Sequence, residues 1–246
     1  MSKGRDRADA RRIVEQQKAA ERRRRVTIWT SVAVVAVLLV AGVIGWGVLA
    51  GQEKTGADNL TTPSAAVDGG TAFPVGSGPV VVDLYEDFMC PVCDQFETQT
   101  GATIKQLLSE KKITVRYHPV SILDRASNGT QYSTRAAGAA AAAAVAGKFV
   151  EYHDVLYANQ PAEGSDGLTD ARLIELDRSV GLGDAFATAV DDRTYDAWVT
   201  KVTETFSARG YTGTPTIVVA GKRVEGPNRT LPTTAVFTQA VNQATG

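Results

Sequence analysis

The longest apolar stretch of the chain, residues 26–50, contains no charged residue and directly follows the basic run Arg22–Arg25. At about 1.5 Å of rise per residue, a helix of this length spans roughly 37 Å, which exceeds the ~30 Å of a membrane's hydrocarbon core. Because basic flanks stay on the cytoplasmic side, we expect a single transmembrane helix with residues 1–25 in the cytoplasm and all later residues outside it. A cleaved signal peptide with a cleavage site at Val48–Ala50 is the alternative, although the apolar cores of such peptides run only ~7–15 residues.

The hydrophobic pattern changes after the predicted span. Residues 51–72 are rich in small and polar residues without apolar periodicity, which is typical of a flexible linker. The remaining residues, 73–246, have a suitable length for one folded domain. We expect Phe73–Val75 to form a short strand at the edge of that domain's sheet.

The first part of the domain predicts a strand, a helix and a second strand. Residues 80–85 are a β-branched run of strand length, and residues 113–118 form a similar run. Between them, apolar residues recur every three to four positions, as in Phe96, Ile104 and Leu107, which indicates a helix with one apolar face. The crossover predicts that the two strands are parallel.

The second part of the domain is predominantly helical up to about residue 210. The pattern predicts helices over residues 131–157, 169–180 and 192–208, with Thr169 as the N-cap of the second. The alanine-rich run 136–146 is too short for a second membrane span, which needs ~20 residues, and indicates a closely packed helix.

The end of the chain returns to strands. Residues 216–220 and 223–224 predict a hairpin with a turn at Gly221 and Lys222. Apolar residues between Val236 and Val241 are spaced as on one face of a closing helix.

Charge is distributed unevenly along the chain. The net charge of -1 combines 26 basic and 27 acidic residues, but residues 1–25 hold ten basic and four acidic ones. Residues 26–246 therefore carry 26 − 10 = 16 basic and 27 − 4 = 23 acidic side chains, a net charge of −7. Because binding of phosphates needs basic residues gathered on a folded surface, this balance argues against a nucleic-acid-binding domain.

The only two cysteines are Cys90 and Cys93, which flank Pro91 and Val92 at the predicted junction of strand and helix. Two cysteines are too few for a four-cysteine zinc or iron-sulfur site. The helix N-terminus stabilises a thiolate at Cys90, and the thiolate is the reacting species. We therefore expect Cys90 to be the nucleophile and Cys93 the resolving thiol of a redox-active disulfide. An inert structural disulfide, or half of a metal site shared by two chains, is the alternative.

A second motif, Gly213–Thr216, leads directly into the strand predicted over residues 216–220. Pro215 lacks the N–H that a central strand needs. A cis peptide bond would turn the backbone so that Thr214 presents its N–H and C=O to an extended client chain. From the residues alone the trans form is favoured, because it is the usual state of such bonds.

These motifs together resemble those of the DsbA family of thioredoxin-fold thiol-disulfide oxidoreductases. The chain is most similar to the membrane-tethered DsbA-like proteins of actinobacteria. The resemblance covers residues 73–246, and the matching pieces are Tyr85–Cys93, Phe96–Glu97, Phe149–His153 and Gly213–Thr216.

The resemblance implies an α/β thioredoxin-like fold with an all-helical subdomain inserted at about residues 120–210. It also implies that Thr214 and Pro215 form a cis-proline loop that faces Cys90 and binds substrate. The family oxidises cysteine pairs of exported proteins with no cofactor or metal besides the redox-active disulfide. A quinone-linked membrane enzyme, in actinobacteria similar to vitamin K epoxide reductase, reoxidises it. Isomerases of this superfamily often carry a separate dimerisation domain, and the segment before this domain is too short for one, which favours a monomer.

The sequence departs from the family's pattern in two places. Many members carry a buried acid six residues before the first cysteine, where this chain has Leu84. Because side chains alternate along a strand, Asp83 is expected on the other face. Glu86 and Glu97 are therefore the candidates for proton transfer with Cys93.

The second departure is Val92, which replaces the histidine of the strongly oxidising enterobacterial form. It leaves the oxidising strength open.

Two alternative functions remain. The same cysteines would serve a disulfide isomerase or reductase, and a non-redox client-binding module would not need them. Both histidines, His118 and His153, are expected to be structural.

Overall fold

The computed structural model describes residues 60–245, so the predicted cytoplasmic segment 1–25, the predicted span 26–50 and the start of the linker lie outside the described residues. Within the part that is described, no helix is both long enough and apolar enough to cross a membrane.

The centre of the domain is a five-stranded sheet with the order β1-β3-β2-β4-β5. Strand β2 (Val80–Glu86) pairs in parallel with β3 (Ile113–Pro119), and the pairings of β1 (Phe73–Gly76) with β3, of β2 with β4 (Thr216–Val219) and of β4 with β5 (Lys222–Arg223) are antiparallel. The predicted parallel pair and the predicted edge strand β1 are both present.

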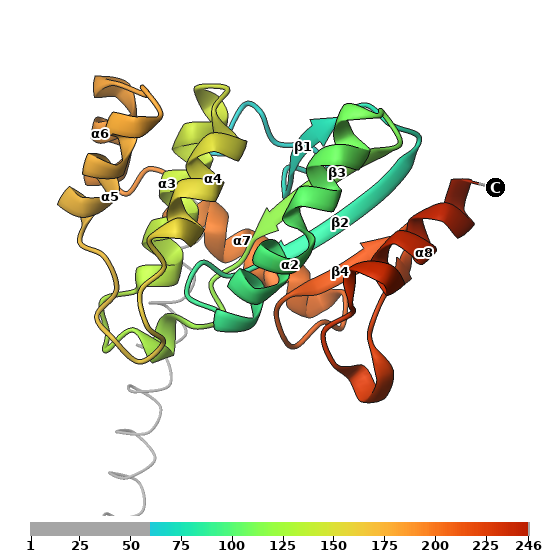
Figure 1. Cartoon of the computed structure of the whole chain (residues 1–246). Coiled ribbons are helices and arrows are strands. Elements are labelled where there is room, and N and C mark those ends of the chain that lie inside the picture. The colour runs from blue at the N-terminus through green and yellow to red at the C-terminus, as the bar shows by residue number, and fades with distance from the viewer. Residues whose placement is uncertain (1–59, 246) are drawn as a thin grey trace, which may run out of the picture. The chain divides into compact units, whose positions relative to one another are not determined.

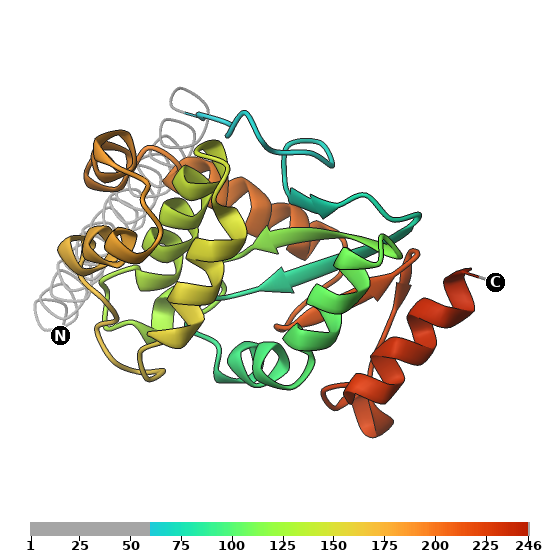
Figure 2. The same ribbon diagram turned by 45° about the horizontal axis from the view of Figure 1, so that its top comes forward.

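Helices cover both faces of this sheet (Figures 1 and 2). Helix α2 (Pro91–Ser109) connects β2 to β3 and packs beside the closing helix α8 (Thr234–Thr245) on one face. Phe96 and Phe237 meet edge to face there, with ring centroids 6.1 Å apart. Helix α7 (Asp196–Ala208) lies on the opposite face and packs against β3.

A helical subdomain is inserted between β3 and β4. It comprises η1 (Asp124–Ala126), α3 (Tyr132–Val145), α4 (Phe149–Ala158), α5 (Asp170–Leu176), η2 (Asp177–Ser179) and α6 (Asp184–Asp191), and it leads into α7. The alanine run lies in α3, whose residues 132–144 are buried against α4, α6 and α7. The small side chains allow this close packing, as expected. Thr169 caps α5 by accepting a hydrogen bond from the Arg172 N–H, also as predicted.

Several predicted boundaries were wrong. The single helix expected over 131–157 is two helices, because Gly147, with a φ of 74°, reverses the chain after α3. Helix α7 begins at Asp196 rather than at residue 192, and α6 was not predicted. The hairpin turn consists of Ala220 and Gly221, because both adopt positive φ and Val219 pairs with Lys222. Such backbone angles are those of a two-residue turn that follows the twist of the strands.

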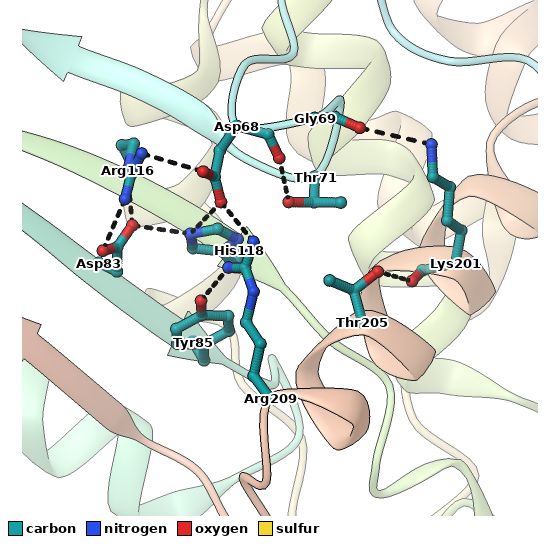
Figure 3. Close-up of polar contacts among 10 residues, drawn as sticks. All are labelled: Asp68, Gly69, Thr71, Asp83, Tyr85, Arg116, His118, Lys201, Thr205 and Arg209. Atoms are coloured by element: carbon teal, nitrogen blue, oxygen red, sulfur yellow. Dashed lines mark hydrogen bonds and ion pairs between the residues drawn. The ribbon is translucent and has the colours of Figure 1, made fainter. Parts of the chain in front are cut away.

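The part of the predicted linker that the structure describes, residues 60–72, differs from a flexible tether. Asp68 binds Arg116 of β3 at 3.0 Å and Arg209, just after α7, at 2.8 Å (Figure 3). The Trp198 indole donates to the Gly70 carbonyl oxygen at 2.6 Å. Pairing between charges far apart in the sequence, which composition does not reveal, attaches this segment to the sheet and to α7.

Asp68 can be tested as the attachment point. Replacing Asp68 by Asn keeps a residue that tolerates the observed φ of 56° but removes the charge that two arginines share. We expect the variant to lose about 1–2 kcal/mol of unfolding free energy in urea titrations, because partly buried Arg209 loses its carboxylate partner and Arg116 keeps only Asp83. The control is Glu175→Ala, which removes an exposed ion pair with Arg172. An equal midpoint for both variants would show that Asp68 is only a surface charge.

Candidate active site

The cysteine pair lies at the predicted junction of β2 and α2. Cys90 is the N-cap residue of α2, and Pro91 occupies the first turn, where a missing N–H leaves no bond unmade. Cys93 lies one turn further along and is fully buried, whereas Cys90 is 6% exposed. Both are free thiols in this structure. The sulfur nearer to solvent is therefore the one placed for attack by another molecule.

The Gly-Thr-Pro motif meets Cys90 across 124 residues of sequence. The peptide bond between Thr214 and Pro215 is cis, and the Cys90 thiol donates to the Thr214 carbonyl oxygen at 3.4 Å. The Thr214 hydroxyl is buried without a hydrogen-bond partner. Beside this loop is a pocket of about 190 Å³, which is lined by apolar Val92, Leu231 and Pro232 and by charged Arg223, Glu225 and Arg229.

The two sulfurs differ in their tendency to ionise. A hydrogen bond from the Cys93 thiol, together with the N–H groups of the first turn of α2, lowers the pKa of Cys90 to about 6 although burial opposes ionisation. Burial is the main reason that the pKa of Cys93 is raised well above its ordinary value, and the nearby charge of Glu86 adds to it. At neutral pH the pair therefore holds one thiolate, at Cys90, and one thiol.

The structure brings the two predicted carboxyl groups together behind Cys93. Glu86 ends β2, Glu97 lies one turn beyond Cys93 on α2, and both belong to one tight cluster with His153 of α4. Burial raises the pKa of Glu97 to about 8, and the charge of Glu86 adds to this effect. One oxygen of each carboxyl group, Oε1, is buried without a partner. The cluster can therefore hold and release a proton close to the buried thiol.

His153 is the member of this cluster that the sequence analysis did not assign to the site. Its Nε2 lies 3.2 Å from Glu86 Oε2, and its Nδ1 lies 3.6 Å from Asp154 Oδ1. Burial by itself lowers the pKa of His153, but the carboxyl groups of Asp154, Glu86 and Glu97 raise it to about 10. The signal available in the sequence was only a histidine next to an aspartate in a helix, because Glu86 and Glu97 lie far away along the chain.

Asp87 is a second residue that the sequence analysis missed. It is fully buried and accepts hydrogen bonds from the N–H groups of Met89 and Leu123 and from the Ser133 hydroxyl at 2.9, 2.9 and 2.7 Å. Burial raises its pKa to about 7, and the charge of Cys90 contributes. Asp87 thereby fixes the loop before Cys90 to the helical subdomain.

The loop before Cys90 is also held by a residue just beyond the C-terminus of α4. Gln160 donates through its side-chain amide to the carbonyl oxygens of Phe88 and Cys90, at 3.2 and 3.0 Å. Together with Asp87, this contact leaves the main chain that carries Cys90 few other conformations.

Asp83 and His118 lie away from the cysteines, as the alternation along β2 predicts. Asp83 binds Arg116 at 2.6 Å and His118 at 3.1 Å on the side of the sheet that holds Asp68 (Figure 3). The His118 ring stacks on Tyr85, with centroids 4.1 Å apart. This group supports the sheet and makes no contact with either sulfur.

Comparison with known proteins agrees with this site. The thioredoxin family model matches residues 76–235. The fold is similar to that of reduced DsbA from Mycobacterium tuberculosis, with 31% identity, a TM-score of 0.61 and coverage of 72% of this chain and 93% of that one. It is also similar to MdbA, a thiol-disulfide oxidoreductase from Actinomyces oris, with 27% identity, a TM-score of 0.62 and coverage of 76% and 91%.

A curated relative is the serine/threonine-protein kinase PknE of Mycobacterium tuberculosis. It is 30% identical over 155 residues, which are 57% of this chain and 27% of the kinase. The chain thus spans about a quarter of the length of this relative. The predicted resemblance to the DsbA family and the predicted thioredoxin-like fold with a helical insertion are confirmed.

The ionisation of Cys90 can be measured directly. We expect the rate of alkylation of the reduced protein to follow a titration with a midpoint near pH 6. Because the Cys93 thiol is the largest stabilising contact, Cys93→Ala should raise this midpoint by about one pH unit or more.

Stability provides a second measurement of the same group. The pKa of Cys90 is lower in the folded state than in the unfolded state, so its ionisation stabilises the reduced fold above the pKa of a free thiol. This contribution is lost as the pH falls through about 6. If alkylation of the wild-type protein instead has its midpoint in the pH range of ordinary thiols, the site does not activate Cys90.

Proposed function

This chain belongs to the DsbA-like thiol-disulfide oxidoreductases of the thioredoxin family, and we propose that it oxidises cysteine pairs of exported proteins through a Cys90–Cys93 disulfide. The observation that carries the proposal is the unequal ionisation of the two sulfurs. A thiolate stabilised at Cys90 is a good leaving group and makes the reduced form more stable, which is what a disulfide that oxidises others requires.

The reaction proceeds by two exchanges. A client thiolate attacks the Cys90 sulfur, a bond forms between client and Cys90, and the electron pair of the Cys90–Cys93 bond passes to Cys93. A second client thiolate then attacks the client sulfur of this mixed disulfide, and Cys90 leaves as a thiolate. Two client thiols are oxidised to a disulfide, and the enzyme disulfide is reduced by the same two electrons.

The Glu86 and Glu97 carboxyl groups would donate a proton to the Cys93 sulfur and accept it again. Because burial holds the pKa of Cys93 high, the sulfur must be protonated once it has left as a thiolate. Glu97 is protonated up to a pH of about 8 and shares its cluster with Glu86. These two carboxyl groups are the proton donor for the buried sulfur, and they take the proton back when Cys93 is reoxidised.

Client chains would bind beside Thr214 and Pro215. The Thr214 carbonyl oxygen already lies 3.4 Å from Cys90, so a backbone that pairs with this residue places its cysteine next to the reactive sulfur. The pocket beside this loop, lined by apolar and charged side chains that include Val92, Leu231 and Arg229, accommodates a neighbouring side chain of an unfolded client.

The cellular setting follows from the sequence. We place residues 1–25 in the cytoplasm, a single transmembrane helix at 26–50 and the catalytic domain on the extracytoplasmic side, and we propose a monomer. Exchange with the client consumes the disulfide, so a reoxidising partner is required. A membrane enzyme similar to vitamin K epoxide reductase fits, because the predicted anchor would keep the domain close to it.

Equilibration with glutathione tests the direction of the reaction. We expect a reduction potential less negative than the roughly −270 mV of thioredoxin, and more negative than the roughly −120 mV of the strongest oxidants because the side chain of Val92 offers no donor to the thiolate. A potential at or below that of thioredoxin would contradict the oxidase and favour a reductase. Cys90→Ser should abolish oxidation of a reduced client, whereas a non-redox binding module would keep its activity in this variant.

Trapping identifies the partners. In Cys93→Ala the mixed disulfide at Cys90 cannot be resolved internally, so adducts should accumulate and be identified by mass spectrometry. We expect exported proteins and one membrane protein among them. As a control for location, a membrane-impermeant thiol reagent should label Cys90 in intact, reductant-treated cells. Adducts consisting only of cytoplasmic proteins would contradict the proposed orientation.

A further inference from the structure

The helical subdomain contributes a buried base to the redox site. His153 of α4 is 3% exposed and reaches Glu86 of β2 across 67 residues of sequence, at 3.2 Å. It is enclosed by aromatic rings of Phe88, Tyr117, Phe149 and Tyr157, whose centroids lie 4.9–5.7 Å from its own. Water does not surround this imidazole, so its charge is felt mainly by the carboxyl groups that it faces.

The charges around His153 come from every element packed against it. The groups are Glu86 from β2, Glu97 from α2, Asp154 from its own helix, and the hydroxyls of Tyr117 on β3 and Tyr157 on α4. Asp154 is itself paired with Lys105 at 2.6 Å. The Glu86 and Glu97 carboxyl groups therefore have one cation close to them inside the cluster, and it is His153.

Two buried carboxylates cannot both ionise next to each other without such a cation. The Oε1 atom of each carboxyl group is buried without a hydrogen-bond partner, so it is free to take a proton. The positive charge of His153 favours an ionised carboxylate in this pair, and a carboxylate can accept a proton. Loss of that charge favours protonation of both carboxyl groups, which removes the acceptor.

We propose that His153 is a positioning residue for the Cys93 half of the exchange reaction: as an imidazolium it keeps the Glu86–Glu97 pair able to accept the proton of Cys93 whenever the active-site disulfide closes. This inference rests on the proposed function. It assigns the helical subdomain a part in reoxidation, through a residue that touches neither sulfur.

The step concerned is the closure of the disulfide. Cys90 is joined to an oxidised partner in a mixed disulfide, and the Cys93 sulfur attacks the Cys90 sulfur. The Cys90–Cys93 bond forms, the bond to the partner breaks, and the partner leaves as a thiolate with the electron pair. The proton of the Cys93 thiol passes to the carboxyl pair, so atoms and charge balance.

The test follows both halves of the reaction of the reduced full-length protein with glutathione disulfide. Acid quenching and mass spectrometry separate attack by Cys90, which forms the mixed disulfide, from closure by Cys93, which releases glutathione. In His153→Gln we expect closure at pH 7 to slow about tenfold, a part of the 10²–10⁴ that general acid-base catalysis supplies. Attack by Cys90 should change less than about twofold, since the low pKa of its thiol has other causes.

The pH dependence of the closure rate in His153→Gln provides a further test. Loss of a cation raises the pH at which the carboxyl pair gives up its second proton, so the defect in closure should shrink as the pH rises from 7 to 9. A defect that is constant with pH, or that affects both halves equally, would indicate a general loss of structure and overturn the proposal.

His118 provides the matched control. It is also buried and also bonded to a carboxylate, Asp83, at 3.1 Å. His118→Gln should leave closure at the wild-type rate. If it slows closure as much as His153→Gln does, the effect is not specific to the cluster behind Cys93 and the inference fails.

A second set of variants covers the case in which His153→Gln does not fold. In Glu86→Gln/Glu97→Gln neither carboxyl group of the pair remains to accept the proton, and adding His153→Gln also removes the cation beside it. We expect closure in the triple variant to be as slow as in the double variant and no slower. Further slowing would show that His153 acts independently of the pair. If the wild-type protein does not exchange with glutathione disulfide at all, the proposed function fails rather than this inference.

Discussion

The unequal surroundings of two neighbouring thiols are the constraint on which this domain's chemistry depends, because they lower the pKa of Cys90 and raise that of Cys93. The helix N-terminus supplies donors to the first, and full burial keeps the second protonated. Any change that exposes Cys93 or moves Cys90 off the helix start would make the two thiols alike and remove the direction of the reaction.

The helical subdomain maintains this difference as much as the sheet does. Ser133 of α3 and Gln160, just beyond α4, hold the loop that carries Cys90. His153 of α4 holds the carboxyl groups behind Cys93. The subdomain is thus bonded to both sides of the cysteine pair. Its closely packed alanine helix gives these side chains a rigid support, since small residues allow neighbouring helices to approach closely.

Local patterns were sufficient for the strands, for most helices and for the reactive pair, but not for helix α6, the break between α3 and α4, or the polar contacts between distant segments. The β-branched run, the apolar stripe after Cys93 and the Thr169 cap each depend on neighbouring residues, and all were predicted. Asp87 and His153 each depend on a partner far along the chain: Ser133 lies 46 residues from Asp87, and Glu86 lies 67 residues from His153. Likewise, the segment around Asp68 is fixed by arginines on β3 and after α7, which a composition rich in small residues cannot show.

The two buried histidines show how strongly partners on neighbouring elements determine the charge of a side chain. Burial lowers the pKa of His118, and the carboxyl groups of Asp83 and Asp68 do not reverse this, since the charge of Arg209 also acts against protonation. Burial also acts on His153, yet the surrounding carboxyl groups raise its pKa to about 10. The difference lies in the neighbouring charges: three carboxyl groups, those of Asp154, Glu86 and Glu97, act on His153, and among the described residues no cation opposes them in the same way. Residue type and burial are the same at both positions, so only the charges on neighbouring elements make one imidazole a neutral support and the other a cation behind Cys93.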